Sequence, residues 1–190
     1  MGDELNLSWS GPYSWPDFEA TNGLPGLPVF GGVYLQTAEY EGGYLIYCAG
    51  VTGRPFRERF IEHTKCYLAG EYTVLDITAL QQGRRAEIWH GWGYARAHRA
   101  EFAARQAEIC AAANQQMAGF RLFVAPVGDR RIRERLEAAI MNCLYAAPPP
   151  LCEVPDRGMM LSPRRPGEAP ITVANRCDSQ LHGLSDHLPI

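Results

Sequence analysis

The sequence contains a single lysine, no long apolar run and no closely spaced pair of cysteines. Lys65 is the only lysine among the 18 basic residues of a 190-residue chain. No apolar stretch approaches the ~20 residues that a membrane-spanning helix needs. The first residues also lack the basic start and apolar core of a secretory signal. We therefore expect a cytoplasmic protein with no membrane association.

The six cysteines are scattered along the chain, and none belongs to a Cys-x-x-Cys pair. Structural zinc sites usually need closely spaced thiols or imidazoles. A chain of this length can bury enough apolar surface to fold without metals or disulfides. The cysteines are therefore expected to be free thiols in a reducing compartment.

The net charge of −3 argues against a protein that coats nucleic acid by bulk electrostatics. A local basic groove is still compatible with this balance. Arginine suits bidentate phosphate contacts, although a GC-rich coding sequence would give the same bias. The candidate nucleic-acid contacts are two arginine pairs, Arg84 with Arg85 and Arg130 with Arg131. The second pair is equally typical of the solvated face of a helix.

Composition divides the chain into three parts. Residues 1–30 are rich in proline and glycine and predict an arm, or a short helix, that leads into the core. Residues 31–145 carry the periodic patterns of a folded domain. Residues 146–190 hold eight of the 14 prolines. This last part predicts an extension that is either packed on the domain or partly disordered.

The central part predicts a mixed α/β fold. Alternating apolar residues around a glycine-rich turn indicate a β-hairpin, and a long alanine-rich stretch favours a helix. Asp129 is a suitable N-cap for the last helix. Residues 72–77 and 86–89 predict two short strands, or a strand and a loop. We expect a small, mainly antiparallel sheet, built from residues 31–51 and 120–125 and flanked by helices at 54–67, 95–117 and 130–145.

Four polar side chains on these elements could form a catalytic site. Tyr34 lies on the first strand of the hairpin, and Arg59 and His63 share one face of the following helix. Glu137 adjoins the apolar stripe of the last helix. Such a set could activate a nucleophile, offset transition-state charge and bind a hard cation. Each residue also has an ordinary explanation; Glu137, for example, could pair with Arg133.

The order of these residues resembles the GIY-YIG nuclease family. Gly32-Val33-Tyr34 is similar to the first half of the family name, and Tyr47-Cys48-Ala49-Gly50 on the next strand is similar to the second half. Arg59, His63 and Glu137 follow at the corresponding places. The resemblance spans residues 31–145 and implies a GIY-YIG-like fold.

The resemblance implies metal-dependent hydrolysis of DNA phosphodiester bonds, in repair, restriction or mobile elements. Tyr34 would orient or deprotonate the attacking water, and Arg59 would offset the charge on the phosphorus. His63 would assist proton transfer or hold Tyr34. Glu137 would bind Mg²⁺ or Mn²⁺. DNA is the implied partner, and nothing in the sequence indicates an oligomeric state.

Two positions depart from the family pattern. The family places its second tyrosine two residues before the glycine, where this chain has Cys48. Because a one-residue shift turns a strand side chain to the opposite face, Tyr47 reaches the site if a β-bulge restores its direction. The alternative is that Tyr47-Cys48-Ala49 is itself the motif. An asparagine that many members carry after the glutamate helix is also absent, which leaves Asn175 as a candidate substitute.

Two other functions fit the same residues. A catalytically eroded site would leave a module that binds nucleic acid or protein without cleavage. A hydrolase acting on a small phosphorylated substrate would use the same four side chains. An enclosed pocket would favour that hydrolase over a nuclease with an open basic groove.

Overall fold

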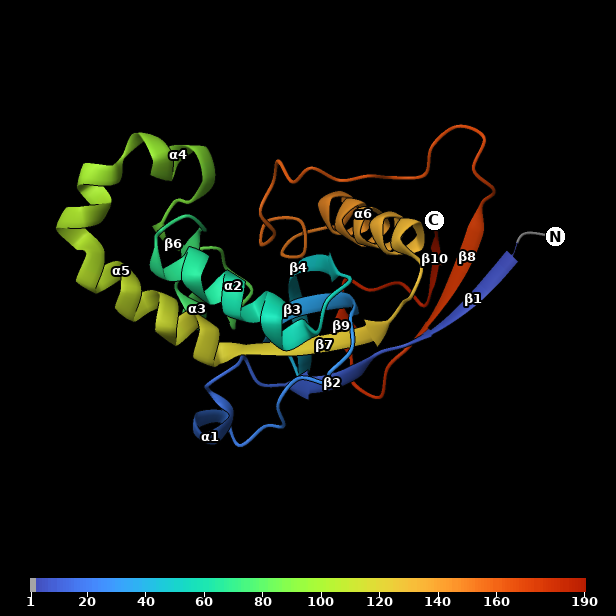
Figure 1. Cartoon of the computed structure of the whole chain (residues 1–190), viewed down its shortest axis with the longest axis horizontal. Helices are drawn as coiled ribbons and strands as arrows, with labels where there is room; N and C mark the ends of the chain where they lie inside the picture. Colours follow the sequence, from blue (N-terminus) through green and yellow to red (C-terminus); the bar gives the residue numbers. More distant parts are fainter. Residues whose placement is uncertain (1–2) are drawn as a thin grey trace.

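A five-stranded sheet with the strand order β2-β7-β3-β4-β9 lies at the centre of the molecule (Figure 1). The computed structural model describes residues 3–190. Three neighbouring pairs of this sheet are antiparallel, and the pair of β4 with β9 is parallel. The strands are β2 (Ser10–Tyr13), β3 (Gly32–Tyr40), β4 (Gly43–Thr52), β7 (Phe120–Pro126) and β9 (Leu181–His182).

Two smaller sheets complete the strand structure of the described residues. In the first, β1 (Asp3–Ser8) runs parallel to β8 (Ile171–Arg176), and β8 is antiparallel to β10 (His187–Pro189). The second pairs β5 (Val74–Leu75) with β6 (Glu87–Trp89). The predicted mixed α/β class is thus confirmed. The prediction of one small, mainly antiparallel sheet is not, because three sheets form and two of them combine parallel and antiparallel pairs.

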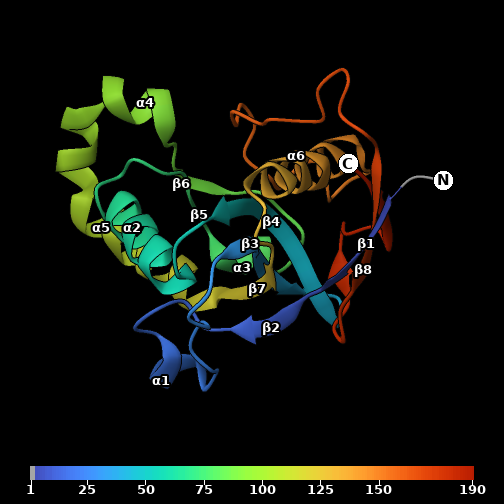
Figure 2. The same ribbon diagram turned by 45° about the vertical axis from the view of Figure 1, so that its right-hand side comes forward.

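Helices cover both faces of the central sheet (Figure 2). One face packs apolar side chains of α2 and α5 against Tyr34, Leu45 and Leu122. The other face packs α6 and the three-stranded sheet against Val33 and Leu35. Over residues 3–190 the helices are α1 (Glu19–Asn22), α2 (Phe56–Leu68), α3 (Ile77–Leu80), α4 (Trp92–Ala97), α5 (Arg99–Gly119) and α6 (Arg130–Ala146).

The predicted helices at 54–67 and 130–145 match α2 and α6, and Asp129 caps α6 by accepting a hydrogen bond from the backbone N–H of Ile132 at 2.8 Å. The prediction of one helix over 95–117 is wrong, because His98 separates α4 from α5. The His98 ring stacks on Tyr94 with centroids 3.7 Å apart, and its Nδ1 lies 2.8 Å from the Tyr94 carbonyl oxygen. These local contacts stabilise the non-helical backbone at His98.

Both ends of the described chain are built into sheets. The predicted arm supplies β1, β2 and α1, and the tail, defined here as residues 146–190, supplies β8, β9 and β10. The six cysteines are free thiols. Among the residues described, no helix combines the length and apolar character needed to cross a membrane.

Candidate functional site

One small pocket gathers all five residues predicted to act in catalysis or metal binding. We call it the tyrosine pocket. Its volume of about 110 Å³ is enough for a phosphate group or a few water molecules. The predicted residues that line it are Tyr34 on β3, Tyr47 on β4, Arg59 and His63 on α2, and Glu137 on α6.

A β-bulge brings Tyr47 to the pocket. Gln36 pairs with Cys48 and the next residue, Thr37, pairs with Ile46, so Tyr47 is the extra residue on β4. Because a bulge turns two successive side chains toward the same side, Tyr47 and Cys48 both line the pocket. The bulge is thus the arrangement that lets Tyr47 reach the site despite its one-residue displacement from the family pattern.

Gly50 allows the phenol ring of Tyr34 to lie across β4. The two residues are register partners. A Cβ atom built on Gly50 would lie 2.3 Å from the Tyr34 ring, far inside van der Waals contact. Any side chain at position 50 would therefore push Tyr34 out of its place.

Tyr34 and His63 form a buried, neutral pair. The Tyr34 hydroxyl oxygen lies 2.8 Å from His63 Nε2. Burial raises the pKa of Tyr34 well above its usual value, with Arg59 acting in the opposite direction. Burial, with a further contribution from Arg59, lowers the pKa of His63 to about 3. At neutral pH a phenol therefore faces an uncharged imidazole, which carries one acceptor nitrogen.

Arg59 supplies a positive charge that is only partly neutralised. Its Nη1 donates to Glu62 at 3.3 Å, but Glu62 is held more closely by both Nη atoms of Arg54, at 2.7 and 2.8 Å. The buried Nε of Arg59 has no hydrogen-bond partner within residues 3–190. The side chain as a whole is 33% exposed and lines the tyrosine pocket, so its accessible part can meet an anion there.

Glu137 is a half-buried carboxylate with no ion pair or hydrogen bond to any described residue. Burial raises its pKa to about 7, against the opposing charge of Arg59. The pairing with Arg133 that the sequence allowed does not form. Arg133 instead donates to the carbonyl oxygens of Val127 and Gly128, each at 3.0 Å.

Asp156 in the tail also lines the tyrosine pocket, although the sequence pattern did not predict it as a site residue. Its Oδ2 accepts from the Tyr47 hydroxyl at 2.8 Å and from Trp92 Nε1 at 3.1 Å, and its Oδ1 accepts from Arg85 Nη2 at 2.6 Å. The only local signal was Val-Pro-Asp-Arg-Gly, which is typical of a turn. Asp156 therefore fixes the tail over the pocket.

The four arginines predicted to contact nucleic acid lie outside the tyrosine pocket. Arg84 is exposed, and Arg85 binds Asp156. Arg130 pairs with Glu134, and Arg131 holds the tail through Glu168 and Ser162. Their role in DNA binding therefore stays a prediction.

The candidate substitute for the missing asparagine lies elsewhere in the fold. The Asn175 side chain accepts from Trp9 Nε1 at 3.0 Å and donates to the Ser185 carbonyl oxygen at 2.8 Å. It is not among the residues that line the tyrosine pocket. The prediction that Asn175 takes the place of the missing asparagine is therefore wrong.

The pocket holds one carboxylate that could bind a hard cation, with water as most of the ion's ligands. No group of three or more His, Cys, Asp or Glu side chains that could hold a metal occurs in the described part of the chain. Mg²⁺ often binds through one or two carboxylates and keeps several water ligands. Because Glu137 has no protein partner and Asp156 already has three, Glu137 is the carboxylate in this pocket that could bind such an ion.

Comparison with protein-family models, with curated proteins and with solved structures gave no significant match. The resemblance to GIY-YIG nucleases therefore depends on the residue pattern of the sequence alone.

Proposed function

We propose that this protein is a divalent-metal-dependent endonuclease of the GIY-YIG type that hydrolyses DNA phosphodiester bonds. The observation that supports it best is the meeting, in one pocket, of the Tyr34–His63 pair, Arg59 and the unpaired Glu137. These groups come from three elements and are up to 103 positions apart in sequence. If each of these four residues had only a structural role, nothing would require all of them to line the same pocket.

In this proposal Tyr34 acts as a proton relay. The raised pKa of its hydroxyl excludes a standing phenolate at neutral pH. The hydroxyl oxygen would instead accept a proton from the attacking water while its own proton passes to His63 Nε2, 2.8 Å away. A phosphate entering the pocket brings negative charge beside His63, which raises the low pKa of the imidazole toward neutrality.

Arg59 would stabilise the charge that develops on the phosphoryl oxygens. Its guanidinium is already desolvated in part and lies in the same pocket as Tyr34, so little reorganisation is needed during the reaction. Glu137 would hold Mg²⁺ or Mn²⁺. When bound there, such an ion supplies charge neutralisation for the phosphate and orients water.

The test is the nicking of supercoiled plasmid with Mg²⁺ or Mn²⁺. We expect nicking by the wild-type protein and its loss in Tyr34→Phe and Glu137→Gln, with unchanged circular dichroism. Matched controls are Tyr44→Phe on β4 and Glu134→Gln, one turn before Glu137 on α6, and both should keep activity. Nicking that persists in Tyr34→Phe and Glu137→Gln would contradict the proposed site.

A catalytically eroded module is the second candidate, and two features favour it. The tyrosine pocket is small and partly covered by the tail, and it offers one carboxylate without a partner. Such a module would bind DNA with salt-dependent affinity but would not cleave plasmid, single-stranded or branched DNA with either metal ion.

A further inference from the structure

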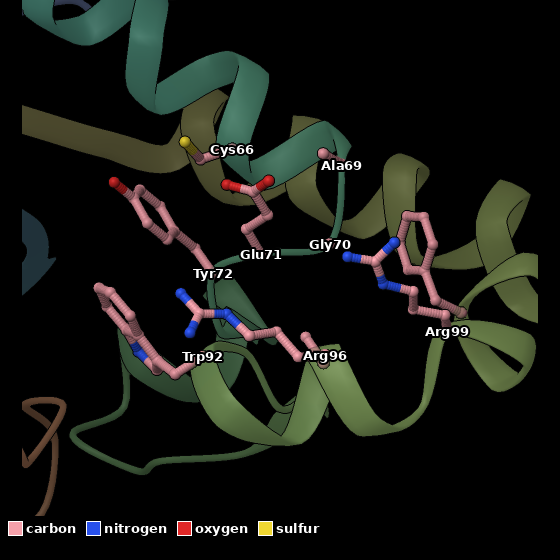
Figure 3. A pocket seen from close by; sticks show the side chains of 10 residues that line it. Cys66, Ala69, Gly70, Glu71, Tyr72, Trp92, Arg96 and Arg99 are labelled. Atoms are coloured by element: carbon pink, nitrogen blue, oxygen red, sulfur yellow. The ribbon is translucent and has the colours of Figure 1, made fainter.

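A second pocket adjoins the tyrosine pocket and is larger, with a volume of about 460 Å³. We call it the arginine pocket (Figure 3). It lies between the C-terminal end of α2 and the helices α4 and α5. Tyr72 and Trp92 line both pockets. A strand with its phosphate in the tyrosine pocket would therefore pass these two aromatic side chains.

Two unpaired cations project into the arginine pocket. The guanidinium groups of Arg96 on α4 and Arg99 on α5 both point into the hollow (Figure 3). Neither makes an ion pair or a hydrogen bond with the residues that the structure describes, whereas Arg85, Arg105 and Arg131 all bind carboxylates. Glu71 is the one acid that lines this pocket. The lining charges therefore favour an anion such as a phosphodiester.

Trp92 is held in an exposed and unusual position at the junction of the two pockets. Its side chain is 47% exposed, and its φ of 59° lies in the left-handed region that bulky residues rarely adopt. The backbone N–H donates to the Glu71 carbonyl oxygen at 2.7 Å, and Nε1 donates to Asp156. These hydrogen bonds stabilise the strained backbone and fix the indole plane.

The aromatic pair offers a stacking surface. The Trp92 and Tyr72 ring centroids are 5.0 Å apart with an interplanar angle of 32°. Tyr72 in turn lies 5.6 Å from the His63 ring, so the surface continues to the Tyr34–His63 pair. Exposed aromatic rings beside unpaired arginines are the combination that single-stranded nucleic acids bind, by base stacking and phosphate contacts.

We propose that the arginine pocket binds an unpaired nucleotide next to the scissile phosphate, with its base on Trp92 and its phosphates on Arg96 and Arg99. This inference rests on the proposed nuclease function and names its substrate class: DNA with a single-stranded segment. Duplex DNA does not fit this pocket, because its base faces are already covered by neighbouring bases.

Binding is measured by fluorescence anisotropy with a labelled ten-residue oligothymidylate, in EDTA and in a Glu137→Ala background, so that no cleavage occurs. We expect tighter binding of the oligonucleotide than of a duplex of equal length. Trp92→Ala should weaken binding roughly 5- to 100-fold, whereas Trp92→Phe, which keeps a stacking ring, should stay within about 3-fold. Trp92→Phe also loses the bond to Asp156, so it separates stacking from tail attachment.

The phosphate contacts are tested by the salt dependence of the same affinity. Replacing Arg96 and Arg99 together by alanine should reduce the slope of log K against log salt by about 1.4, since each phosphate contact on a single strand contributes about 0.7. The matched control replaces Arg164 and Arg176, two exposed arginines of the tail that line neither pocket. The control should leave the slope unchanged.

The outcomes separate this inference from the proposed function. Equal affinity for duplex and single strand, together with no effect of Trp92→Ala, would overturn the inference even if the wild-type protein nicks plasmid. Thymidine monophosphate binding as tightly as the oligonucleotide would also overturn it, in favour of a free nucleotide. Trp92-dependent binding of the single strand without any cleavage would support the inference and contradict the nuclease.

Discussion

Tyr34 and Gly50 face each other across the β3–β4 hairpin, and the missing side chain of Gly50 makes room for the phenol that meets His63. The tyrosine and the glycine of the two motifs are thus parts of one contact. The glycine contributes to the site through the space it leaves.

Gly50→Ala is expected to displace the Tyr34 ring and separate its hydroxyl from His63. Overpacking of this kind destabilises a protein by about 1–3 kcal/mol, and nicking should fall to the level of Tyr34→Phe. Urea unfolding and plasmid nicking measure the two effects. Gly128→Ala is the control, because a Cβ there meets no atom within 4 Å and its backbone has no positive φ. Full nicking by Gly50→Ala would show that Tyr34 does not need this position.

Glu137 should make stability fall as the pH rises. Its pKa of about 7 in the folded protein lies above the usual 4.5, so the folded state binds the proton more tightly than the unfolded chain does. The stabilising contribution is complete below about pH 4.5 and is lost as the pH rises to about 7. We expect Glu137→Gln to be more stable than the wild-type protein at pH 8 by about 1–3 kcal/mol, measured by urea unfolding. A wild-type protein that is as stable as Glu137→Gln at pH 8, or more stable than it, would contradict this prediction.

Metal binding at Glu137 should show the opposite pH trend. Because the ion needs the ionised carboxylate, Mg²⁺ should raise the melting temperature at pH 8 more than at pH 5.5. This shift should vanish in Glu137→Gln and persist in Glu134→Gln. A shift of equal size in both variants would place the ion elsewhere.

His63 should make the protein sensitive to acid. Its pKa of about 3 in the folded state lies below the usual 6.5, so its contribution to stability is present above pH 6.5 and is lost as the pH falls toward 3. His63→Gln should therefore show a shallower loss of stability between pH 6.5 and 4. Parallel curves for the two proteins, measured by urea unfolding at several pH values, would refute this role of the buried imidazole.

Asp156→Ala should both destabilise the protein and loosen the tail. It removes the acceptor of the buried Tyr47 hydroxyl, and a buried donor without a partner costs about 1–3 kcal/mol. It also breaks the hydrogen bonds from Arg85 and from the exposed Trp92, although Arg85 keeps its bonds to Glu87 and to the Val154 carbonyl oxygen. We expect faster proteolysis within residues 151–161. The exposed Asp178, replaced by alanine, is the control. An unchanged proteolysis rate in Asp156→Ala would mean that other contacts hold the tail.

The hairpin, α2 and α6 could be predicted because their patterns are local. Alternation, a glycine turn and the Asp129 cap each act within a few residues. The family resemblance also predicted that Tyr34, Arg59, His63 and Glu137 share one site. The position of Tyr47 depended on a β-bulge. The sequence allowed this bulge, but it did not show whether the bulge forms.

The rest depends on contacts between distant segments. The pairing of β1 with β8 joins residues that are 168 positions apart, so no local pattern in either strand identifies its partner. Asp156 reaches Tyr47 across 109 positions from a proline-rich stretch. The break at His98 interrupts an alanine-rich stretch whose helix propensity predicts one continuous helix.

The parallel pairing of β1 with β8 also bears on when the protein becomes functional during its synthesis. The strand β1 has no partner until residues 171–176 have been translated, and β2 must wait for β7. Such high contact order slows folding. Asp156, which holds Tyr47, is likewise added late. A nascent chain therefore carries the hairpin and Arg59 long before the tyrosine pocket is closed, because the pocket is complete only after Asp156 has been translated.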